Sequence, residues 1–327
     1  MLSTKTPYRI SFFGGGTDYK DWFSENGGSF ISMGINKYCY IYCRTLPPFF
    51  PYKSRIVWSK IEQVLDNSEI THPVIREALV REKIKNIEIH HMGDLPARSG
   101  LGSSSSFSVG ILHALRAIKK IEIDKKQLAI DAIDLERNTL NEAGGIQDQI
   151  AASFGGFNYV EIKKSGDFII NKIRLPKCQR KQFEASILLI FTGIFRNSFE
   201  VAQDQIKNFS KRTKELEKIS SITKDAKSVL DSNDFIRDFG SLLNETWRYK
   251  KQLSSKVSNS VIDEIYTEAL SAGAYGGKLL GAGAGGFMVV VAPSNRIENI
   301  KNRLNKLIHV PIKIDESGTE LSNEKFE

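Results

Sequence analysis

Hydrophobic and polar positions along the first part of the chain are typical of strands, and they then change to helical spacing. Residues 6–13 and 29–46 mix β-branched and aromatic side chains around three glycines at 14–16, which predicts strands joined by turns. A further strand is expected at 86–92, before a loop of glycine and serine at 99–106. The first part of the chain is therefore predicted to begin as strands and turns rich in glycine.

Two helices are predicted after this loop. Apolar residues recur at helical spacing over 107–118, and nothing breaks the pattern before two lysines. The second helix has a clear start at Asp124, which can cap it, and Gln127 three residues later completes a variant capping box. Two glycines at 144–145 are expected to stop the second helix.

Strand character then returns, which indicates a second domain. Residues 151–175 combine strand and turn patterns, and a new strand-rich start at 186–192 follows Pro176. Charged residues lie between the two stretches, beside Pro176. We therefore predict two domains, residues 1–180 and 181–327.

The second domain is predicted to be mostly helical over 197–272 and to end in strands. No internal repeat and no low-complexity segment interrupts the chain. The tail is expected to form a strand, a helix and a last strand, over 286–292, 295–308 and 309–314.

Composition agrees with a folded protein. Of the 327 residues, 41% are hydrophobic and 26% are charged, which excludes disordered, collagen-like and coiled-coil classes. The 46 basic and 38 acidic residues give a formal net charge of +8. This excess fits an anionic partner such as phosphate, and it also fits a solvated basic surface. Because the basic residues are dispersed among acidic ones, no nucleic-acid partner is expected.

The cysteines and the apolar runs indicate a cytoplasmic protein. Cys39, Cys43 and Cys178 form no CxxC pair, so neither a disulfide framework nor a structural zinc site is expected. The first thirty residues are too charged for a secretory signal, and the longest apolar runs are too short to span a bilayer. No membrane partner is therefore predicted.

The segment 95–106, LPARSGLGSSSS, is predicted to bind an anion between a strand and a helix. Glycines let a phosphate approach the backbone, N–H groups at a helix start point towards it, and serine hydroxyls can donate to oxygens or bind Mg²⁺. The alternative is a serine-rich helix cap, but four serines exceed what a cap requires. No Walker A motif occurs here.

A second glycine cluster lies at 276–286, GGKLLGAGAGG, with a formal GxGxxG at positions 281, 283 and 286. A dinucleotide fingerprint follows a strand and opens a helix, whereas here a helix is expected before the glycines and a strand after them. We interpret the cluster as a tight loop that packs against a bound ligand or against the first glycine loop. A plain connection between elements is the alternative.

Two carboxylates flank the glycine turn at 144–145. Separated carboxylates such as Glu136 and Asp148 suit phosphoryl transfer, in which one holds a metal and the other orients the attacking hydroxyl. A glutamate on a helix surface and an aspartate that caps a helix would give the same sequence pattern. Near the amino terminus, Arg9 precedes the triple glycine, and Asp18 follows it as a turn residue or as an acceptor for sugar hydroxyls.

The chain resembles the superfamily of galactokinase, homoserine kinase, mevalonate kinase and phosphomevalonate kinase in four segments that occur in order. These are PYRISFFGGGTDY, LPARSGLGSSSS, the Glu136 to Asp148 stretch followed by FGG, and GGKLLGAGAGG. Within the superfamily, GGGTDY and GGIQDQIAASFGGFN are most similar to the D-glycero-D-manno-heptose 7-phosphate kinases and their fucose-kinase relatives.

The resemblance implies a two-domain α/β (α+β) fold. The amino-terminal domain would be like a ribosomal protein, the carboxy-terminal domain would be ferredoxin-like, and the active site would lie between them. It also implies ATP and Mg²⁺. The implied phosphate-binding residues are Gly100, Leu101, Gly102, Ser103, Ser104 and Ser105, and the implied metal ligands are Ser104 and Glu136.

The resemblance further implies how the acceptor is held. Asp148 would face the sugar hydroxyl as the catalytic carboxylate, and Arg9 would pair with it and keep it ionised. The implied substrate-binding residues are Gly15, Gly16, Thr17, Asp18 and Gly283.

The implied activity is transfer of phosphate from ATP to the anomeric hydroxyl of heptose 7-phosphate, giving the 1,7-bisphosphate for nucleotide-activated heptose. A kinase for L-fucose or another hexose is an alternative, and so is a non-catalytic sensor of sugar and ATP. The substrate's own phosphate predicts a second anion site, with Arg98 and Arg196 as candidates. Trp58 is a candidate for stacking on adenine, although simple packing is favoured. The oligomeric state is left open.

Overall fold

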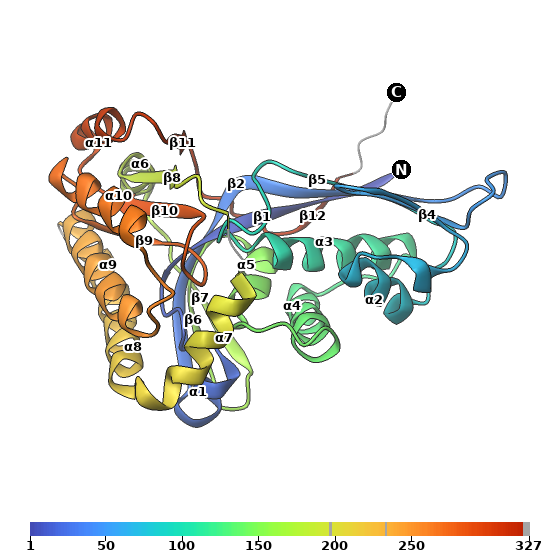
Figure 1. Ribbon diagram of the computed structural model, residues 1–327, viewed down its shortest axis with the longest axis horizontal. Coiled ribbons are helices and arrows are strands. Elements are labelled where there is room, and N and C mark those ends of the chain that lie inside the picture. Colours follow the sequence, from blue (N-terminus) through green and yellow to red (C-terminus); the bar gives the residue numbers. More distant parts are fainter. Residues whose placement is uncertain (196–197, 233, 323–327) are drawn as a thin grey trace.

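Two separate sheets organise the protein, as Figure 1 shows. The computed structural model describes residues 1–195, 198–232 and 234–322. Within these residues, eight strands form one mixed sheet and four form a second, antiparallel sheet. The predicted mixture of helices and strands is therefore confirmed.

The first sheet is built around two long strands, β1 (Leu2–Phe13) and β2 (Gly28–Thr45), which pair antiparallel. Helix α1 (Lys20–Asn26) lies in the connection between them. One end of β2 pairs with β5 and the other with β6, so β2 extends across both parts of the sheet. The other strands are β3 (Ser54–Val57), β4 (Ile61–Val64), β5 (Ile87–Gly93), β6 (Phe157–Ile162), β7 (Phe168–Lys172) and β12 (Glu320–Ser322).

Helix α3 (Ser103–Ile118) covers β1 and β2 with its apolar side. The predicted helical spacing is confirmed, and the helix starts inside the serine run. At Gly110 a Cβ atom would lie 2.8 Å from the Thr6 hydroxyl, so only glycine permits the close crossing of helix and strand. Beside it lie α2 (Pro73–Glu82), α4 (Lys125–Asp134), a π-helical turn (Leu135–Thr139) and α5 (Gln147–Phe154).

The start of α4 is as predicted, whereas α5 was not predicted. The Asp124 carboxylate accepts a hydrogen bond of 3.0 Å from the Gln127 N–H. The prediction of strand and turn from residue 151 was wrong at its start, because α5 continues to Phe154. Most of its eight residues are buried, including the polar Gln147 and Gln149, so polar positions do not mark a solvent-facing side of this helix.

The second sheet holds β8 (Ile187–Phe191), β9 (Gly276–Leu279), β10 (Phe287–Val291) and β11 (Ile308–Val310). Strand β10 is fully buried, as its unbroken apolar run indicates. The helices in this half of the chain are α6 (Lys177–Ala185), α7 (Ser198–Asn208), α8 (Thr213–Ser228), α9 (Phe235–Gln252), α10 (Ser260–Ser271) and α11 (Ile297–Arg303). Of these, α8 packs on β1 and β2 of the first sheet, and α9 packs on β9 and β10 of the second.

Two predictions about the last part of the chain were wrong. Strand β9 stands between helix α10 and the glycine loop, so the loop joins two strands rather than following a helix directly. The strand predicted at 309–314 ends at Val310, and a later strand, β12 (Glu320–Ser322), pairs with β1 in the first sheet. The division of the chain near residue 180 stays a prediction.

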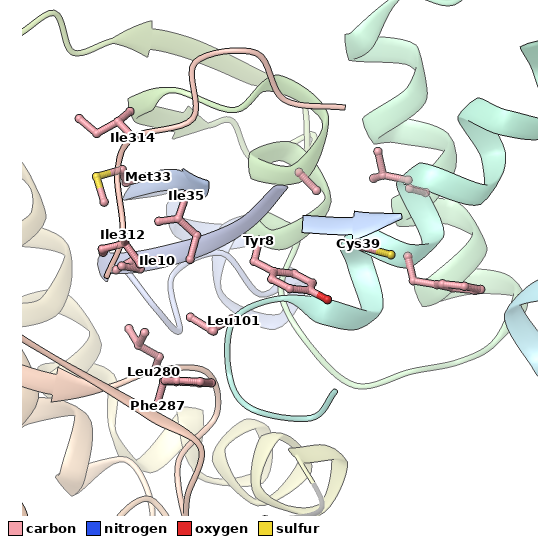
Figure 2. Packing of buried hydrophobic residues seen from close by; sticks show 14 of the residues in the cluster. Tyr8, Ile10, Met33, Ile35, Cys39, Leu101, Leu280, Phe287, Ile312 and Ile314 are labelled. Carbon is pink, nitrogen blue, oxygen red and sulfur yellow. The ribbon is translucent and has the colours of Figure 1, made fainter. Parts of the chain in front are cut away.

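Aromatic and aliphatic side chains join the two sheets. Phe12 of β1 packs edge-on against Phe239 of α9, with ring centroids 5.1 Å apart, and Phe183 of α6 packs beside both. Figure 2 shows Leu101, next to the serine run, close to Leu280 and Phe287 of the second sheet. This shared core fixes the serine loop against both sheets. None of the described helices is long and apolar enough to cross a membrane.

We predict that Phe239→Ala lowers the free energy of unfolding by about 3–5 kcal/mol, because it leaves a cavity among packed rings. Denaturation in guanidinium chloride measures the loss. Phe49→Ala serves as the control: this ring is 89% exposed, so its removal should change stability by less than about 0.5 kcal/mol. Similar losses in the two variants would contradict the role given to the ring cluster.

Candidate active site

A bidentate ion pair between Arg9 and Asp148 lies at the centre of the candidate site. Arg9 on β1 donates from Nε and Nη2 to the two carboxylate oxygens, at 2.9 and 2.8 Å. The arginine side chain is almost fully buried, whereas that of Asp148 is 25% exposed. Asp148 stands in the first turn of α5, so its carboxylate is held rigidly and can still meet a ligand.

The same guanidinium holds the serine loop. Nη1 of Arg9 donates to the Gly100 carbonyl at 2.6 Å, and the Arg9 N–H donates to the Leu101 carbonyl at 3.1 Å. Gly100 has a φ of 88° and Gly102 a φ of 73°, a region that side chains other than glycine rarely adopt. A Cβ at Gly100 would also lie 2.5 Å from the Leu280 carbonyl oxygen. The loop is therefore fixed by its glycines as well as by Arg9.

The serines at the start of α3 have different surroundings. Ser103 accepts a hydrogen bond from the Arg98 N–H, and Ser104 is exposed. Ser105 is buried and donates to Glu136 at 3.0 Å, while the role of Ser104 as a metal ligand stays a prediction. The surroundings differ because successive residues of an α-helix are rotated by about 100°, so neighbouring serines point in different directions.

Glu136 is a buried carboxylate with one free oxygen. It lies in the π-helical turn after α4, where Oε2 accepts from Ser105, from Gln149 at 2.6 Å and from Arg137 at 3.1 Å. Oε1 is buried, and no described residue forms a hydrogen bond with it. Burial raises the pKa of Glu136 to about 7, the Arg137 guanidinium opposes the shift, and Glu142 adds to it.

These oxygens fit the ligands that Mg²⁺ prefers. Mg²⁺ is commonly bound by one or two carboxylates together with phosphate oxygens and water. Glu136 supplies an unpartnered carboxylate oxygen, and Ser105 supplies a hydroxyl at the start of a helix. In the part of the chain that the structure describes, no cluster of three or more His, Cys, Asp or Glu side chains could hold a metal alone.

Asp18 is fully buried under the glycine turns. Its carboxylate accepts hydrogen bonds from the N–H groups of Gly16, at 3.0 Å, and Gln147, at 3.5 Å. Burial and then the nearby charge of Asp148 raise its pKa to about 6. A Cβ at Gly145 would lie 1.7 Å from Asp18 Oδ2, so the 144–145 turn closes directly over it. Asp18 thus organises the turn, and its predicted contact with sugar stays a prediction.

The other residues of the triple-glycine turn are close-packed. Thr17 donates from its hydroxyl to the carbonyls of Gly14 and Ser29, each at 2.9 Å, so its side chain supports the turn. Gly16 packs against Leu216, and a Cβ at Gly15 would lie 3.8 Å from the Lys250 amine. The turn therefore lies against helices of the second half of the chain.

The second glycine loop contacts the first, one of the two arrangements that its sequence predicted. The Phe287 N–H donates to the Ser99 carbonyl at 2.9 Å, and a Cβ at Gly286 would lie 2.2 Å from the same oxygen. Gly283 instead packs on the backbone of Val257. Its predicted role at the substrate stays a prediction.

The remaining candidates lie outside this centre or are not described. Arg98 is exposed with a φ of 58°, and Arg196 falls outside the described residues. Trp58 packs edge-on against His72, which in turn packs against Phe107 of α3. The favoured packing role of Trp58 agrees with these contacts, and adenine stacking stays a prediction.

Sequence reasoning missed several side chains of the site. Gln149 donates to Glu136, and Gln147 accepts a hydrogen bond of 2.7 Å from Ser11. Arg137 contacts Glu136 and also donates to the Glu142 carbonyl at 2.8 Å, which supports the 144–145 turn. The glutamines flank Asp148 in the sequence, a signal that could have found them.

Comparison with known proteins decides the family. The model of the GHMP kinases N terminal domain matches residues 69–156, and that of the GHMP kinases C terminal domain matches residues 230–309. The chain belongs to the GHMP kinases. It is therefore a kinase, and the serine loop, Glu136 and Asp148 lie within the match to the first of these domains.

Individual relatives extend the likeness over nearly the whole chain. The chain is 30% identical to D-glycero-alpha-D-manno-heptose 7-phosphate kinase from Campylobacter jejuni over 322 residues, 93% of each chain. It is 27% identical to a galactokinase from Pyrococcus furiosus, over 91% of each. Among solved structures, a D-glycero-D-manno-heptose 1-phosphate kinase from Bacteroides thetaiotaomicron superposes with a TM-score of 0.82 at 25% identity, over 99% of each chain.

We predict that wild-type stability falls relative to that of Glu136→Gln as the pH rises from about 4.5 to about 7. Because the pKa of buried Glu136 is raised, the folded protein holds a proton that the unfolded chain releases within this range. The relative loss should reach at most about 3 kcal/mol. Guanidinium unfolding of both proteins across this range measures it, and parallel curves would show that Glu136 does not titrate as described.

Proposed function

We propose that this GHMP kinase transfers the terminal phosphate of ATP to the anomeric hydroxyl of D-glycero-D-manno-heptose 7-phosphate, giving the 1,7-bisphosphate. The observation that carries the proposal is the buried Arg9 paired with the part-exposed Asp148 beside the serine loop. The name of the Campylobacter jejuni relative supports the choice of acceptor. The product suits a pathway to nucleotide-activated heptose.

The serine loop is the proposed site for the ATP phosphates. Helix α3 starts at Ser103 with unpaired N–H groups and a positive dipole end, which attract phosphate oxygens. The positive φ values of Gly100 and Gly102 let the backbone approach the nucleotide. Glu136 and Ser105 are the described residues that fit Mg²⁺, and Ser104 remains the choice by resemblance. When bound, Mg²⁺ would offset charge on the phosphate oxygens.

Asp148 is proposed to orient the acceptor hydroxyl and take its proton. The carboxylate is open enough to meet a sugar, and both its oxygens already face Arg9. An ionised carboxylate is the form that accepts a proton from a hydroxyl. Because Arg9 also holds Gly100, the same residue sets the position of Asp148 relative to the phosphate loop. Alignment of the acceptor with the donor phosphate is the main requirement in phosphoryl transfer.

Three other functions compete with this one. Galactokinase and fucokinase relatives support an unphosphorylated hexose, and the Bacteroides protein is named for a heptose 1-phosphate activity. A non-catalytic sensor of sugar and ATP is disfavoured, because Arg9, Asp148 and Glu136 are all present and brought together around one loop.

Coupled ADP release with ATP and Mg²⁺ tests the proposal across a panel of acceptors. The panel holds heptose 7-phosphate, unphosphorylated heptose, mannose, galactose and L-fucose. Selective turnover of heptose 7-phosphate is expected. Turnover of a free sugar instead would overturn the acceptor and leave a sugar kinase, and no turnover across the panel would favour the sensor.

We predict that Asp148→Asn lowers kcat by about 10²- to 10⁴-fold, the usual contribution of a general base, while ATP affinity is unchanged. Steady-state kinetics and titration with a non-hydrolysable ATP analogue measure the two effects. Asp167→Asn, at a part-exposed aspartate in the turn before β7, is the matched control and should keep full activity. Near-normal turnover of Asp148→Asn would remove this carboxylate from the mechanism.

A further inference from the structure

Lys278 is a fully buried lysine that the proposed mechanism does not use. It lies on β9 of the second sheet, is 1% exposed, and donates from Nζ to the Phe12 carbonyl of β1 at 3.1 Å. Among the residues that the structure describes, no carboxylate forms an ion pair with it. A buried ammonium without a carboxylate partner is costly, so its retention at this place calls for a reason.

A second buried lysine lies close by. Lys250 on α9 is 5% exposed, and its Nζ donates to the Gly281 carbonyl at 2.5 Å. A Cβ at Gly15 would lie 3.8 Å from the same Nζ, so the amine borders the triple-glycine turn. Lys250 and Lys278 thus approach the site from two elements of the second half of the chain.

The charges around Lys278 are mostly positive. Burial, then Lys250 and Arg9, hold the pKa of Lys278 well below its ordinary value, and the Asp18 carboxylate opposes them. The other carboxylate of the centre, Asp148, is already paired with Arg9. Three basic side chains, Arg9, Lys250 and Lys278, therefore gather around two carboxylates, Asp148 and the buried Asp18. Such an excess of positive charge is complementary to an anionic ligand.

We propose that Lys250 and Lys278 form an anion subsite that binds a phosphate group of a bound substrate. The inference rests on the proposed function, which supplies two candidate phosphates, that of the sugar acceptor and the terminal one of ATP. The contact of Lys250 with the triple-glycine turn favours the phosphate of the acceptor, while its carbonyl partner Gly281 also borders Gly100 of the serine loop. A substrate phosphate would replace the carbonyls of Phe12 and Gly281 as partners of the ammonium groups.

Access to the two amines requires movement of a glycine segment. The turn at 14–16 and the loop at 281–286 both contain glycines at positive φ, including Gly16 at 107° and Gly281 at 71°. Glycine loses the fewest contacts when a loop changes conformation, because it has no side chain to repack. The subsite therefore lies where two glycine-rich segments meet two buried lysines.

Equilibrium titration of the full chain with three ligands tests the subsite. The ligands are heptose 7-phosphate, the same heptose without phosphate, and a non-hydrolysable ATP analogue. Lys250→Met and Lys278→Met should each weaken heptose 7-phosphate binding by about tenfold or more, as expected when a charged hydrogen bond is lost. Binding of the unphosphorylated heptose and of the ATP analogue should not change.

Lys251→Met is the matched control, because this neighbour on α9 points to Asp263 at 3.0 Å and is more exposed. It should bind all three ligands like the wild type. Thermal unfolding separates a binding role from a structural one. Lys278→Met should keep or raise the Tm, since it removes a buried ammonium without an ion-pair partner. If Lys278→Met fails to fold, the binding measurements on Lys250→Met alone test the subsite.

The outcomes distinguish the acceptor phosphate from the terminal phosphate of ATP, and they distinguish failure of the anion subsite from failure of the proposed function. A loss confined to the ATP analogue would keep the anion subsite and assign it to the nucleotide. Unchanged affinity of both lysine variants for all ligands would overturn the subsite, even if wild-type turnover supports the heptose kinase. If the wild type does not bind heptose 7-phosphate, the acceptor phosphate is overturned together with the proposed acceptor, and the ATP analogue decides whether any subsite exists.

Discussion

The arrangement of the site depends on one guanidinium. Arg9 donates two hydrogen bonds to Asp148 and a third to the Gly100 carbonyl. Because the guanidinium is planar, it fixes the directions of all three bonds. These bonds hold β1, the start of α5 and the serine loop in one geometry. A lysine at this position would keep the charge and lose the fixed fork, so it could not set the same distances.

Most of the fold could be predicted from hydrophobic spacing and caps. Helix α3 and the Asp124 cap of α4 follow from local signals and are confirmed. Helix α5 could not be found in this way, because its residues are buried on nearly every side and give no alternation. Strand β9 was missed for a related reason, since its two glycines and Lys278 do not look like a strand.

The candidate site was predicted from motifs in part only. The serine loop, Glu136, Asp148 and Arg9 are brought together as their motifs indicate. Which serine meets Glu136 depends on where the helix begins, and a run of four serines gives no signal for that. Lys250 and Lys278 could not be recognised, because a charged residue in a sequence normally marks a solvated surface. Their burial is decided by packing between distant segments.

The pairing of β1 with β12 sets an order of events during synthesis. Arg9 lies on β1, which is synthesised before the other described strands, yet the outer neighbour of β1 is formed by residues 320–322. The Ser3 hydroxyl donates a hydrogen bond to the Ser322 carbonyl, 319 positions away in the sequence. Until that segment emerges, one edge of β1 is open to pairing with other chains. A nascent chain would therefore need protection by chaperones for longest at the strand that carries Arg9.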